Sequence, residues 1–460
     1  MRRDGDMTQG NIWRLLTLFA VPLLLGNLLQ QLYNAIDAII VGSYVGKEAL
    51  AAVGSTGPLI NMIIAFFMGM STGASVLISQ FFGAKDARGL HDTVHSAIFL
   101  SLVLGLALSA VGVICSPFLL EWMKTPQEIL PDANEYLRVY FWGMSSLTVY
   151  NMGAAILTAV GDSRRPLYFL ILSAVLNVVG DLAFVLLFHM GIAGVAWATV
   201  LAQVVSAALV IIVLLRAETD YKLIPRDLRL HRGIVQKIAG IGLPGAVQQA
   251  IISISNIVVQ AYINGLGTVT VAGYSAASKL DAFITLPVQT MALVASTFVG
   301  QNLGARQVGR ARRGVNISLI LGLSATLVIA ALALLFGRPL LRFFSTDEAV
   351  LSDGFRFMLV FVPFYFILCG TQILPGALRG AGDVRFATLA CIISFVGLRQ
   401  LFLFLVTKLN YSIETVGLSY PATWLIAAIA ILIHYRRSDW SRFEPAQETP
   451  AEEAPTDAGG

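Results

Sequence analysis

Long apolar segments alternate with short polar connections along almost the whole chain. Each apolar segment holds about 20 residues or more, which is the length an α-helix needs to cross a bilayer. Several are long enough to tilt or bend. Twelve such segments can be marked, over residues 12–43, 49–81, 92–115, 134–159, 166–188, 192–215, 237–263, 270–300, 314–336, 353–376, 386–407 and 415–435. The pattern predicts an all-α integral membrane protein with twelve transmembrane helices.

Two short sequences occur twice, at the same separation. Residues 80–85 (QFFGAK) return as 301–306 (QNLGAR), and residues 161–164 (GDSR) return as 382–385 (GDVR), each 221 positions later. A repeat of nearly half the chain predicts two similar six-helix lobes, as in secondary transporters. An even number of spans precedes the second half, so the two lobes should be parallel repeats around a central cavity.

The polar connections set the expected domain limits. A basic stretch over residues 216–236 separates the sixth and seventh spans. We therefore expect an N-terminal lobe over 1–215, a linker over 216–236 and a C-terminal lobe over 237–437. Residues 438–460 are acidic and rich in Pro, Ala and Glu, which is typical of a disordered tail.

Charge indicates the compartment and the orientation. The chain is 57% hydrophobic and only 13% charged, which excludes an ordinary soluble protein. Most of the 31 Lys and Arg residues fall in connections on the side of the N-terminus, and this asymmetry places both termini in the cytoplasm. The expected location is the cytoplasmic (inner) membrane of a bacterium or archaeon. The net charge of +4 is then a topology signal and gives no reason to expect nucleic acid.

Cysteine and histidine indicate no metal centre. The three cysteines lie in or beside apolar spans without CxxC spacing, and the five histidines are scattered along the chain. No cofactor is expected, and the only metal we expect is sodium.

A polar stripe interrupts the first span. Gln30, Tyr33, Asn34 and Asp37 are spaced i, i+3, i+4, i+7, so they share one helix face. A carboxylate at the centre of a membrane helix costs about 2.5–3.5 kcal/mol, and such residues are functional by default. The bland alternative is that Asp37 satisfies local polar groups or flanks a water-filled mouth.

The fifth span carries a second stripe. Ser173, Asn177 and Asp181 recur every four residues, and Thr199 lies one helix later at a similar depth. Asn151 in the fourth span offers a further oxygen. Together these groups can build a pocket of two acids, amides and hydroxyls. Such a pocket suits a proton or a hard cation such as sodium, and its two acids should titrate as a coupled unit.

Pro22 lies in the first span, fifteen residues before Asp37. Proline removes a backbone hydrogen bond and favours a kink. Bent and straight forms of the span could then differ by little free energy, and protonation of Asp37 would select between them. A static kink is the alternative explanation.

The second half lacks the acids of the first. Val258 and Phe402 stand where the repeat would place Asp37 and Asp181. The seventh span has an uncharged stripe, which marks a candidate C-lobe cavity. Its candidate lining residues are Gln249, Ser253, Asn256, Lys279 and Asp281. Lys279 could repel cationic cargo, pair with an acid or extend toward the headgroups.

These residues resemble those of the multidrug and toxic compound extrusion (MATE) family over roughly residues 10–437. The resemblance is carried by Pro22 with Asp37, by Asn177 with Asp181, and by three segments. The segments are 41–54 (VGSYVGKEALAAVG), 191–199 (GIAGVAWAT) and 377–383 (ALRGAGD).

The resemblance implies an antiporter that exports amphipathic, cationic organic compounds in exchange for protons or sodium, acting as a monomer in the lipid bilayer. It implies a cation site at Asp37, Asn177, Asp181 and Thr199, supported by Tyr33. The seventh and tenth spans have no acid in their interiors, unlike the NorM-like branch. The chain is therefore more similar to the DinF-like branch.

Three other functions fit the sequence less well. A flippase for lipid or lipid-linked oligosaccharide would share the two-lobe architecture, but its cavity should be strongly cationic, and only Lys279 and Arg399 are candidates. An enzyme is not expected, because no HExxH, GxSxG or histidine cluster lies within a span. A channel is disfavoured because neither half offers a symmetric charged ring.

Overall fold

The computed structural model describes residues 5–123 and 125–442, and this part of the chain is all-helical with no strand. The first half forms α1 (Ile12–Ile40), η1 (Val41–Val45), α2 (Lys47–Ala84), α3 (Ala87–Trp122), α4 (Leu130–Trp142), α5 (Met144–Ala159), α6 (Arg164–Leu182), η2 (Ala183–Leu187) and α7 (Gly191–Leu215). The second half forms η3 (Pro225–Asp227), α8 (Arg232–Asn264), α9 (Thr268–Ile284), α10 (Leu286–Gly304), α11 (Val308–Leu335), α12 (Gly337–Leu341), α13 (Glu348–Phe361), η4 (Val362–Phe364), α14 (Tyr365–Gly380), α15 (Arg385–Ile392), η5 (Ile393–Leu398), α16 (Arg399–Val406), α17 (Ile413–Arg437) and η6 (Trp440–Arg442).

All twelve predicted spans are helical. Eleven uninterrupted or nearly uninterrupted segments of the described residues are long and apolar enough to cross a membrane. The fourth predicted span, 134–159, is divided at Gly143 into α4 and α5, and neither piece alone has membrane-spanning length. The apolar pattern therefore identified every span. It did not predict this break, the break at Thr285 between α9 and α10, or the 3-10 turn η4 between α13 and α14.

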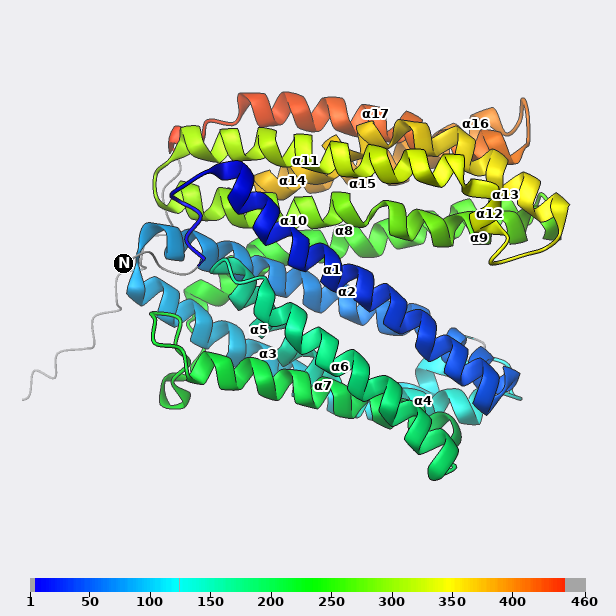
Figure 1. Ribbon diagram of the computed structural model, residues 1–460, viewed down its shortest axis with the longest axis horizontal. Helices are drawn as coiled ribbons and strands as arrows, with labels where there is room; N and C mark the ends of the chain where they lie inside the picture. The colour runs from blue at the N-terminus through cyan, green and yellow to red at the C-terminus, as the bar shows by residue number, and fades with distance from the viewer. Residues whose placement is uncertain (1–4, 124, 443–460) are drawn as a thin grey trace, which may run out of the picture.

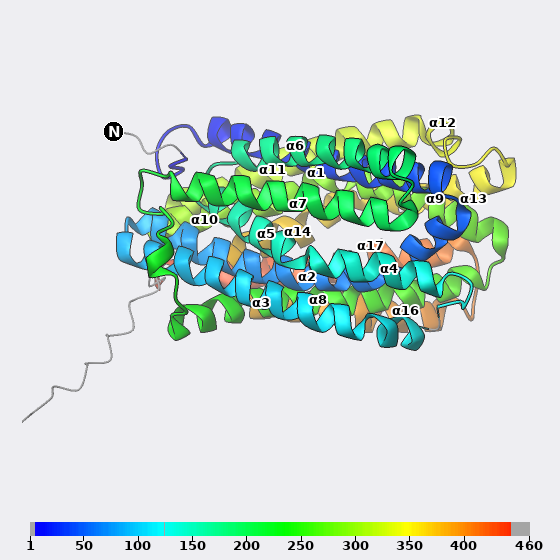
Figure 2. The same cartoon turned by 90° about the horizontal axis from the view of Figure 1, so that it is seen from below.

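The helices form two lobes, one from each half of the sequence (Figure 1). In the first lobe α3 packs on α5 and α6 on α7, and in the second α10 packs on α11 and α14. The view in Figure 2 shows that the helices of both lobes run along the same long axis. The equivalent residues Gly83 and Gly304 of the two repeats lie at the same end of the lobes, as expected of parallel repeats.

Helix α1 belongs to both lobes. Leu16 and Phe19 are buried in the hydrophobic core of the second lobe, which also includes α10 and α14. Further along, Gly26 faces Leu167 and Leu170 of α6, in the first lobe. Pro22 lies between these two contact regions, inside a helix that remains continuous. The predicted hinge residue is therefore where α1 passes from one lobe to the other.

The lobes are in close contact at the end of the bundle that carries the N-terminus, which we call the N-terminal end. Figure 1 shows them side by side there and diverging toward the opposite end. A Cβ on Gly83 would lie 1.9 Å from the Gln301 carbonyl oxygen, and one on Gly304 would lie 2.0 Å from the Gln80 carbonyl oxygen. Glycine is thus required at both positions, and both belong to the repeated sequence QxxGA.

The other repeated sequence forms a helix-ending turn in each lobe. Gly161 and Gly382 have φ values of +91° and +80°, which favour glycine. The amides of Asp162 and Asp383 then donate to Leu157 and Leu378, respectively. The repeated GDxR sequence therefore ends a helix in the same way in both lobes.

Two predicted boundaries need correction. Helix α8 begins at Arg232, inside the predicted linker 216–236, because residues 232–236 continue the helix that follows. Residues 438–442, placed at the start of the tail, form part of the second lobe: Trp440 is buried against Tyr435, and Arg312 stands over both rings. The polar neighbours of Trp440 suggested a tail, but its ring is apolar and packs on the second lobe. The rest of the predicted tail, 443–460, lies outside the described residues.

Candidate cation-binding site

Asp37 and Asp181 lie on neighbouring helices that pack closely together. Asp37 is in the last part of α1 and Asp181 in the last part of α6. Each helix is followed directly by a π-helical segment, η1 after α1 and η2 after α6, and the two segments contact each other. π-Helical turns are rare and are common at functional sites. The sequence analysis did not predict them.

The two carboxyl groups are hydrogen-bonding partners. Asp181 is fully buried and Asp37 is half-buried. Two ionised carboxylates at this separation repel each other, so the contact requires a shared proton or a bound cation. One oxygen of each group, Oδ1 of Asp37 and Oδ1 of Asp181, is buried without a hydrogen-bond donor.

Asn177 and Thr199 complete one side of the pocket. Their side chains are 1% and 5% exposed, and Asn177 lies one turn before Asp181 on α6. The hydrogen-bonding pattern orients the Asn177 amide nitrogen toward Asp181 Oδ2 at 3.1 Å and its oxygen toward the Thr199 hydroxyl at 3.2 Å. The four predicted cation ligands are therefore brought together.

Tyrosine side chains close the pocket. The Tyr33 hydroxyl is a hydrogen-bonding neighbour of Thr199 and lies near Asp37, as the helix face predicted. Two further tyrosines from α4, Tyr136 and Tyr140, lie near Asp37 and are buried. The sequence analysis missed them, although their i, i+4 spacing in an apolar segment was a usable signal.

Three predicted supporting residues are not hydrogen-bonded to the two acids in the described part of the chain. Gln30 and Asn34 are exposed, and Asn151 donates to the Leu147 carbonyl of its own helix. The stripe on α1 therefore divides, with Tyr33 and Asp37 turned to the first lobe. Helix periodicity alone cannot tell which part of a face meets a neighbouring helix.

The pocket has the chemistry that a small hard cation or a proton requires. The residues that meet there offer carboxylate, amide and hydroxyl oxygens. The two unpaired carboxylate oxygens are acceptors that a proton or sodium ion would satisfy. This donor set therefore fits either a proton or a sodium ion.

Asp281, the acid among the candidate C-lobe cavity residues, has a different environment. Asp281 on α9 accepts a hydrogen bond from the Tyr365 hydroxyl of α14, and Tyr365 is fully buried. Lys279 is exposed and stands over the ring of Phe344. The candidate C-lobe residues thus do not form a second acid pair.

Only part of the uncharged stripe on α8 contacts other residues of the second lobe. Gln249 and Ser253 are exposed and bonded to each other within the helix. Asn256 accepts from Arg399, which is 3% exposed and stands over the rings of Phe395 and Tyr420. Arg399 is therefore an aromatic-stacked core residue and does not line an open surface.

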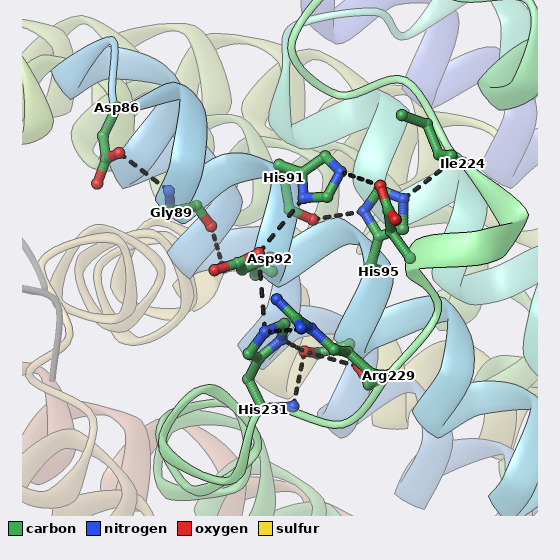
Figure 3. Close-up of polar contacts among 11 residues, drawn as sticks. Asp86, Gly89, His91, Asp92, His95, Ile224, Arg229 and His231 are labelled. Carbon is green, nitrogen blue, oxygen red and sulfur yellow. Dashed lines mark hydrogen bonds and ion pairs between the residues drawn. The ribbon is translucent and has the colours of Figure 1, made fainter. Parts of the chain in front are cut away.

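Three of the five histidines do not remain scattered, contrary to the sequence analysis. His91 and His95 of α3 meet Asp227 of the linker, and His231 contacts Asp92 nearby (Figure 3). The two rings of His91 and His95 are stacked, with centroids 3.9 Å apart. Linker residues far away in sequence could not be placed here from spacing.

The geometry of this cluster favours a structural contact between the linker and α3 over a metal site. His95 Nδ1 lies 2.7 Å from the His91 carbonyl oxygen, and His95 Nε2 accepts from the Ile224 amide at 2.9 Å (Figure 3). Both ring nitrogens are thus engaged by backbone groups, and stacked rings direct their lone pairs in parallel. Ser96 adds a bond to His231. The cluster fastens the linker to α3.

Comparison with known proteins supports the transporter architecture. Residues 22–183 and 244–405 each match the family model described as MatE. A probable multidrug resistance protein of Bacillus subtilis (strain 168), YoeA, is 28% identical over 439 residues, covering 93% of this chain and 94% of the relative. A FAD transporter of Shewanella oneidensis is 28% identical over 359 residues, covering 76% and 78%.

Solved structures share the fold. A multidrug resistance MATE family transporter, described in an outward-facing conformation, superposes with a TM-score of 0.89 at 24% identity, covering 95% of this chain and 98% of that one. A transporter of the same superfamily from Pyrococcus furiosus gives a TM-score of 0.88 over the same shares. The family model matches once in each lobe and together covers more than half of the residues, so the chain belongs to the MatE family of multidrug and toxic compound extrusion transporters and is not an enzyme.

Proposed function

We propose that this transporter is a secondary active antiporter that exports amphipathic, cationic organic compounds in exchange for protons or sodium ions. One observation carries the proposal: the Asp37 and Asp181 carboxyl groups contact each other within the first lobe, with one buried oxygen of each lacking a donor. A pair in this position changes its charge whenever a proton or cation enters or leaves. Charge changes inside a membrane are the events that couple ion gradients to movement.

The pair acts on access through α1. Asp37 lies on the half of α1 that packs against α6, whereas Leu16 and Phe19 anchor the other half in the second lobe. A change at Asp37 therefore alters a helix that both lobes share. Pro22, between the anchors, is where the helix can bend with least loss of hydrogen bonding.

Cargo and coupling ion act on one another. If the ion weakens cargo binding by some factor, cargo weakens ion binding by the same factor. An inward-moving charge gains about 2.3 kcal/mol from a 100 mV membrane potential, which supplies the free energy for export. The cycle needs Asp37 and Asp181 to hold the ion, and Asn177 and Thr199 to orient it.

The proposal includes the orientation of the protein in the membrane. The N-terminal end of the bundle carries the basic connections near Lys85, Arg164, Arg306 and Arg385, so this end faces the cytoplasm and both termini lie there. The lobes are closed at this end and diverge at the other, which corresponds to an outward-open arrangement. The protein acts as a monomer in the cytoplasmic membrane of a prokaryotic cell, and its pattern of acids places it nearer the DinF-like branch.

Reconstitution tests coupling and cargo together. Purified protein in lipid vesicles would be given a pH gradient, a sodium gradient or neither, and release of ethidium and rhodamine 6G would be followed. We expect export only with one of the two gradients. Export that ignores both gradients would overturn the antiport proposal.

A second cargo class is tested in the same vesicles, because one relative is described as a FAD transporter. FAD is a large anion, and the first-lobe acid pair would repel it. Gradient-dependent movement of FAD without movement of either cationic dye would replace the cationic-cargo proposal. Movement of a headgroup-labelled lipid without a gradient would favour the flippase.

A further inference from the structure

Gln80 and Gln301 make reciprocal bonds between the lobes. Gln80 of α2 donates from Nε2 to the Gly380 carbonyl at 2.9 Å, and Gln301 of α10 donates from Nε2 to the Ala159 carbonyl at 2.8 Å. The two donors are 221 residues apart, and so are the two acceptors. The internal repeat thus reproduces the same cross-lobe bond twice.

Each acceptor is a helix end. Ala159 is the last residue of α5 and Gly380 the last residue of α14. Carbonyls in the last turn of a helix have no partner within the helix. Each glutamine therefore satisfies an otherwise unpaired carbonyl in the opposite lobe. Gln80 and Gln301 are 3% and 0% exposed, so water does not compete for these bonds in this conformation.

The segment before α1 adds a third component on one side only. The Met7 amide donates to Gln301 Oε1 at 2.9 Å, and the Met7 carbonyl accepts from Asn302 and from Arg310. Met7 is 2% exposed and belongs to the core of the second lobe. On the other side, a Cβ on Gly5 would meet the Val160 carbonyl of the first lobe at 2.1 Å.

Gln301 is consequently the point where three parts of the molecule meet. Its oxygen holds the N-terminal segment, its nitrogen holds the first lobe, and its backbone belongs to the second lobe. Separation of the lobes at this end would break both glutamine bonds and expose the segment around Met7.

We propose that residues 5–10 form a latch which, with the Gln80 and Gln301 bonds, keeps the N-terminal end of the bundle closed. The latch sets the population of the state open at this end, and Gln80 and Gln301 are positioning residues for that closure. It must withdraw before cargo can enter from this side. The inference rests on the proposed alternation of access but is independent of which ion or cargo is used.

Distances between the lobes measure this population directly. Arg164 and Arg385 occupy equivalent exposed positions at the N-terminal end of each lobe, so spin labels at Arg164→Cys and Arg385→Cys report its opening. Cys115, Cys369 and Cys391 would first be replaced by alanine. Loss of one hydrogen bond of ordinary strength should raise the open-to-closed ratio about fivefold.

Three variants distinguish a specific loss of the latch from a general destabilisation of the protein. We expect Gln80→Ala and Gln301→Ala each to raise the open population in double electron–electron resonance, with the larger shift for Gln301→Ala because it loses two bonds. Gln289→Ala is the matched control, since Gln289 lies on the same helix and bonds only to Thr285 of its own lobe. If all three variants gave the same distance distribution as the protein with both glutamines, the proposal would be overturned.

Access to Met7 provides a second measurement. Met7→Cys should react slowly with a membrane-impermeant maleimide, and Gln301→Ala should speed that reaction about 25-fold if both bonds contribute. Ala87→Cys, exposed at the start of α3 and outside residues 5–10, should react rapidly in either background. Fast labelling of Met7→Cys without the glutamine change would show that the segment is not held. Neither readout requires transport, so a failed antiport assay would leave this test intact.

Discussion

The side-chain amide of Asn27 in α1 donates to the hydroxyl of Thr290 in α10, with 3.1 Å between the two atoms. This bond joins the lobes five residues after Pro22, where α1 leaves the second lobe for the first. A helix with one end fixed in each lobe must bend, slide or break contacts when the lobes move. The proline is placed where bending costs least, because it already lacks one backbone hydrogen bond.

Replacing Pro22 by alanine should therefore impair the conformational cycle more than folding. Pro22→Ala restores a backbone donor and favours a straight α1. We expect transport in vesicles to fall about tenfold, while the melting temperature stays the same or rises. Pro58→Ala is the control, because Pro58 also lies inside a long helix, but the close contacts of α2 with the second lobe at Gly69 and Gly83 come after it in the sequence. Equal losses in both variants would remove the hinge assignment.

Neutralising Asp37 should abolish coupling. Asp37→Asn keeps the size of the side chain but cannot release a proton, and it removes the repulsion within the acid pair. We expect gradient-driven dye export to fall at least tenfold while membrane insertion is unchanged, and the same for Asp181→Asn. Asn34→Ala, one turn earlier and exposed, should export at the unmodified rate. Undiminished gradient-dependent export by Asp37→Asn would disprove the proposed site.

Thr199 distinguishes sodium from protons. A sodium ion needs several oxygen ligands, whereas a proton needs only the carboxyl pair. Thr199→Val removes the hydroxyl that contacts the Asn177 amide and leaves that buried amide under-bonded, at a cost of about 1–3 kcal/mol.

For a sodium-coupled protein, the sodium concentration that half-saturates export should rise about fivefold or more. For a proton-coupled protein, the pH dependence of export should stay nearly the same. The two dependences would be measured on the same vesicles, with Ser206→Ala, a buried hydroxyl on the same helix, as control. A sodium dependence that is present but insensitive to Thr199→Val would place the sodium ion elsewhere.

Asp281 tests whether coupling is confined to the first lobe. Its carboxylate is paired with the Tyr365 hydroxyl, a bond that the oxygen of an asparagine can also accept. Asp281→Asn should therefore change gradient-driven export less than twofold. A loss as large as that of Asp37→Asn would mean that the second lobe also contributes a coupling group.

Sequence patterns were sufficient for the lobes and for the acid site because both depend on local periodicity. Apolar length located all twelve spans, and spacing placed Asn177 and Asp181 on one face of α6. The acid pair could be predicted because a carboxylate is too costly in a membrane to occur without a partner.

Features that depend on contacts between distant segments were not predicted. The cross-lobe bonds of Gln80 and Gln301 could not be predicted, since sequence repetition gives no orientation between lobes. His231 and Asp227 reach α3 only because the linker folds back on it. Trp440 was assigned to the tail from the composition of its surroundings, although its own ring packs on Tyr435.

Helix packing within the second lobe gives the last prediction. A Cβ on Gly376 of α14 would lie 2.3 Å from the Ala292 carbonyl oxygen of α10. Both residues lie within rigid helices. Gly376→Ala should force the two helices apart and lower the free energy of unfolding by about 1–3 kcal/mol. Gly370→Ala, six residues earlier on the same helix, meets only the Ala428 side chain at 4.0 Å and should be neutral or slightly stabilising. Melting temperatures of the two purified variants in one detergent would compare them directly, and a Gly376→Ala protein as stable as Gly370→Ala would show that α10 and α14 can separate without cost.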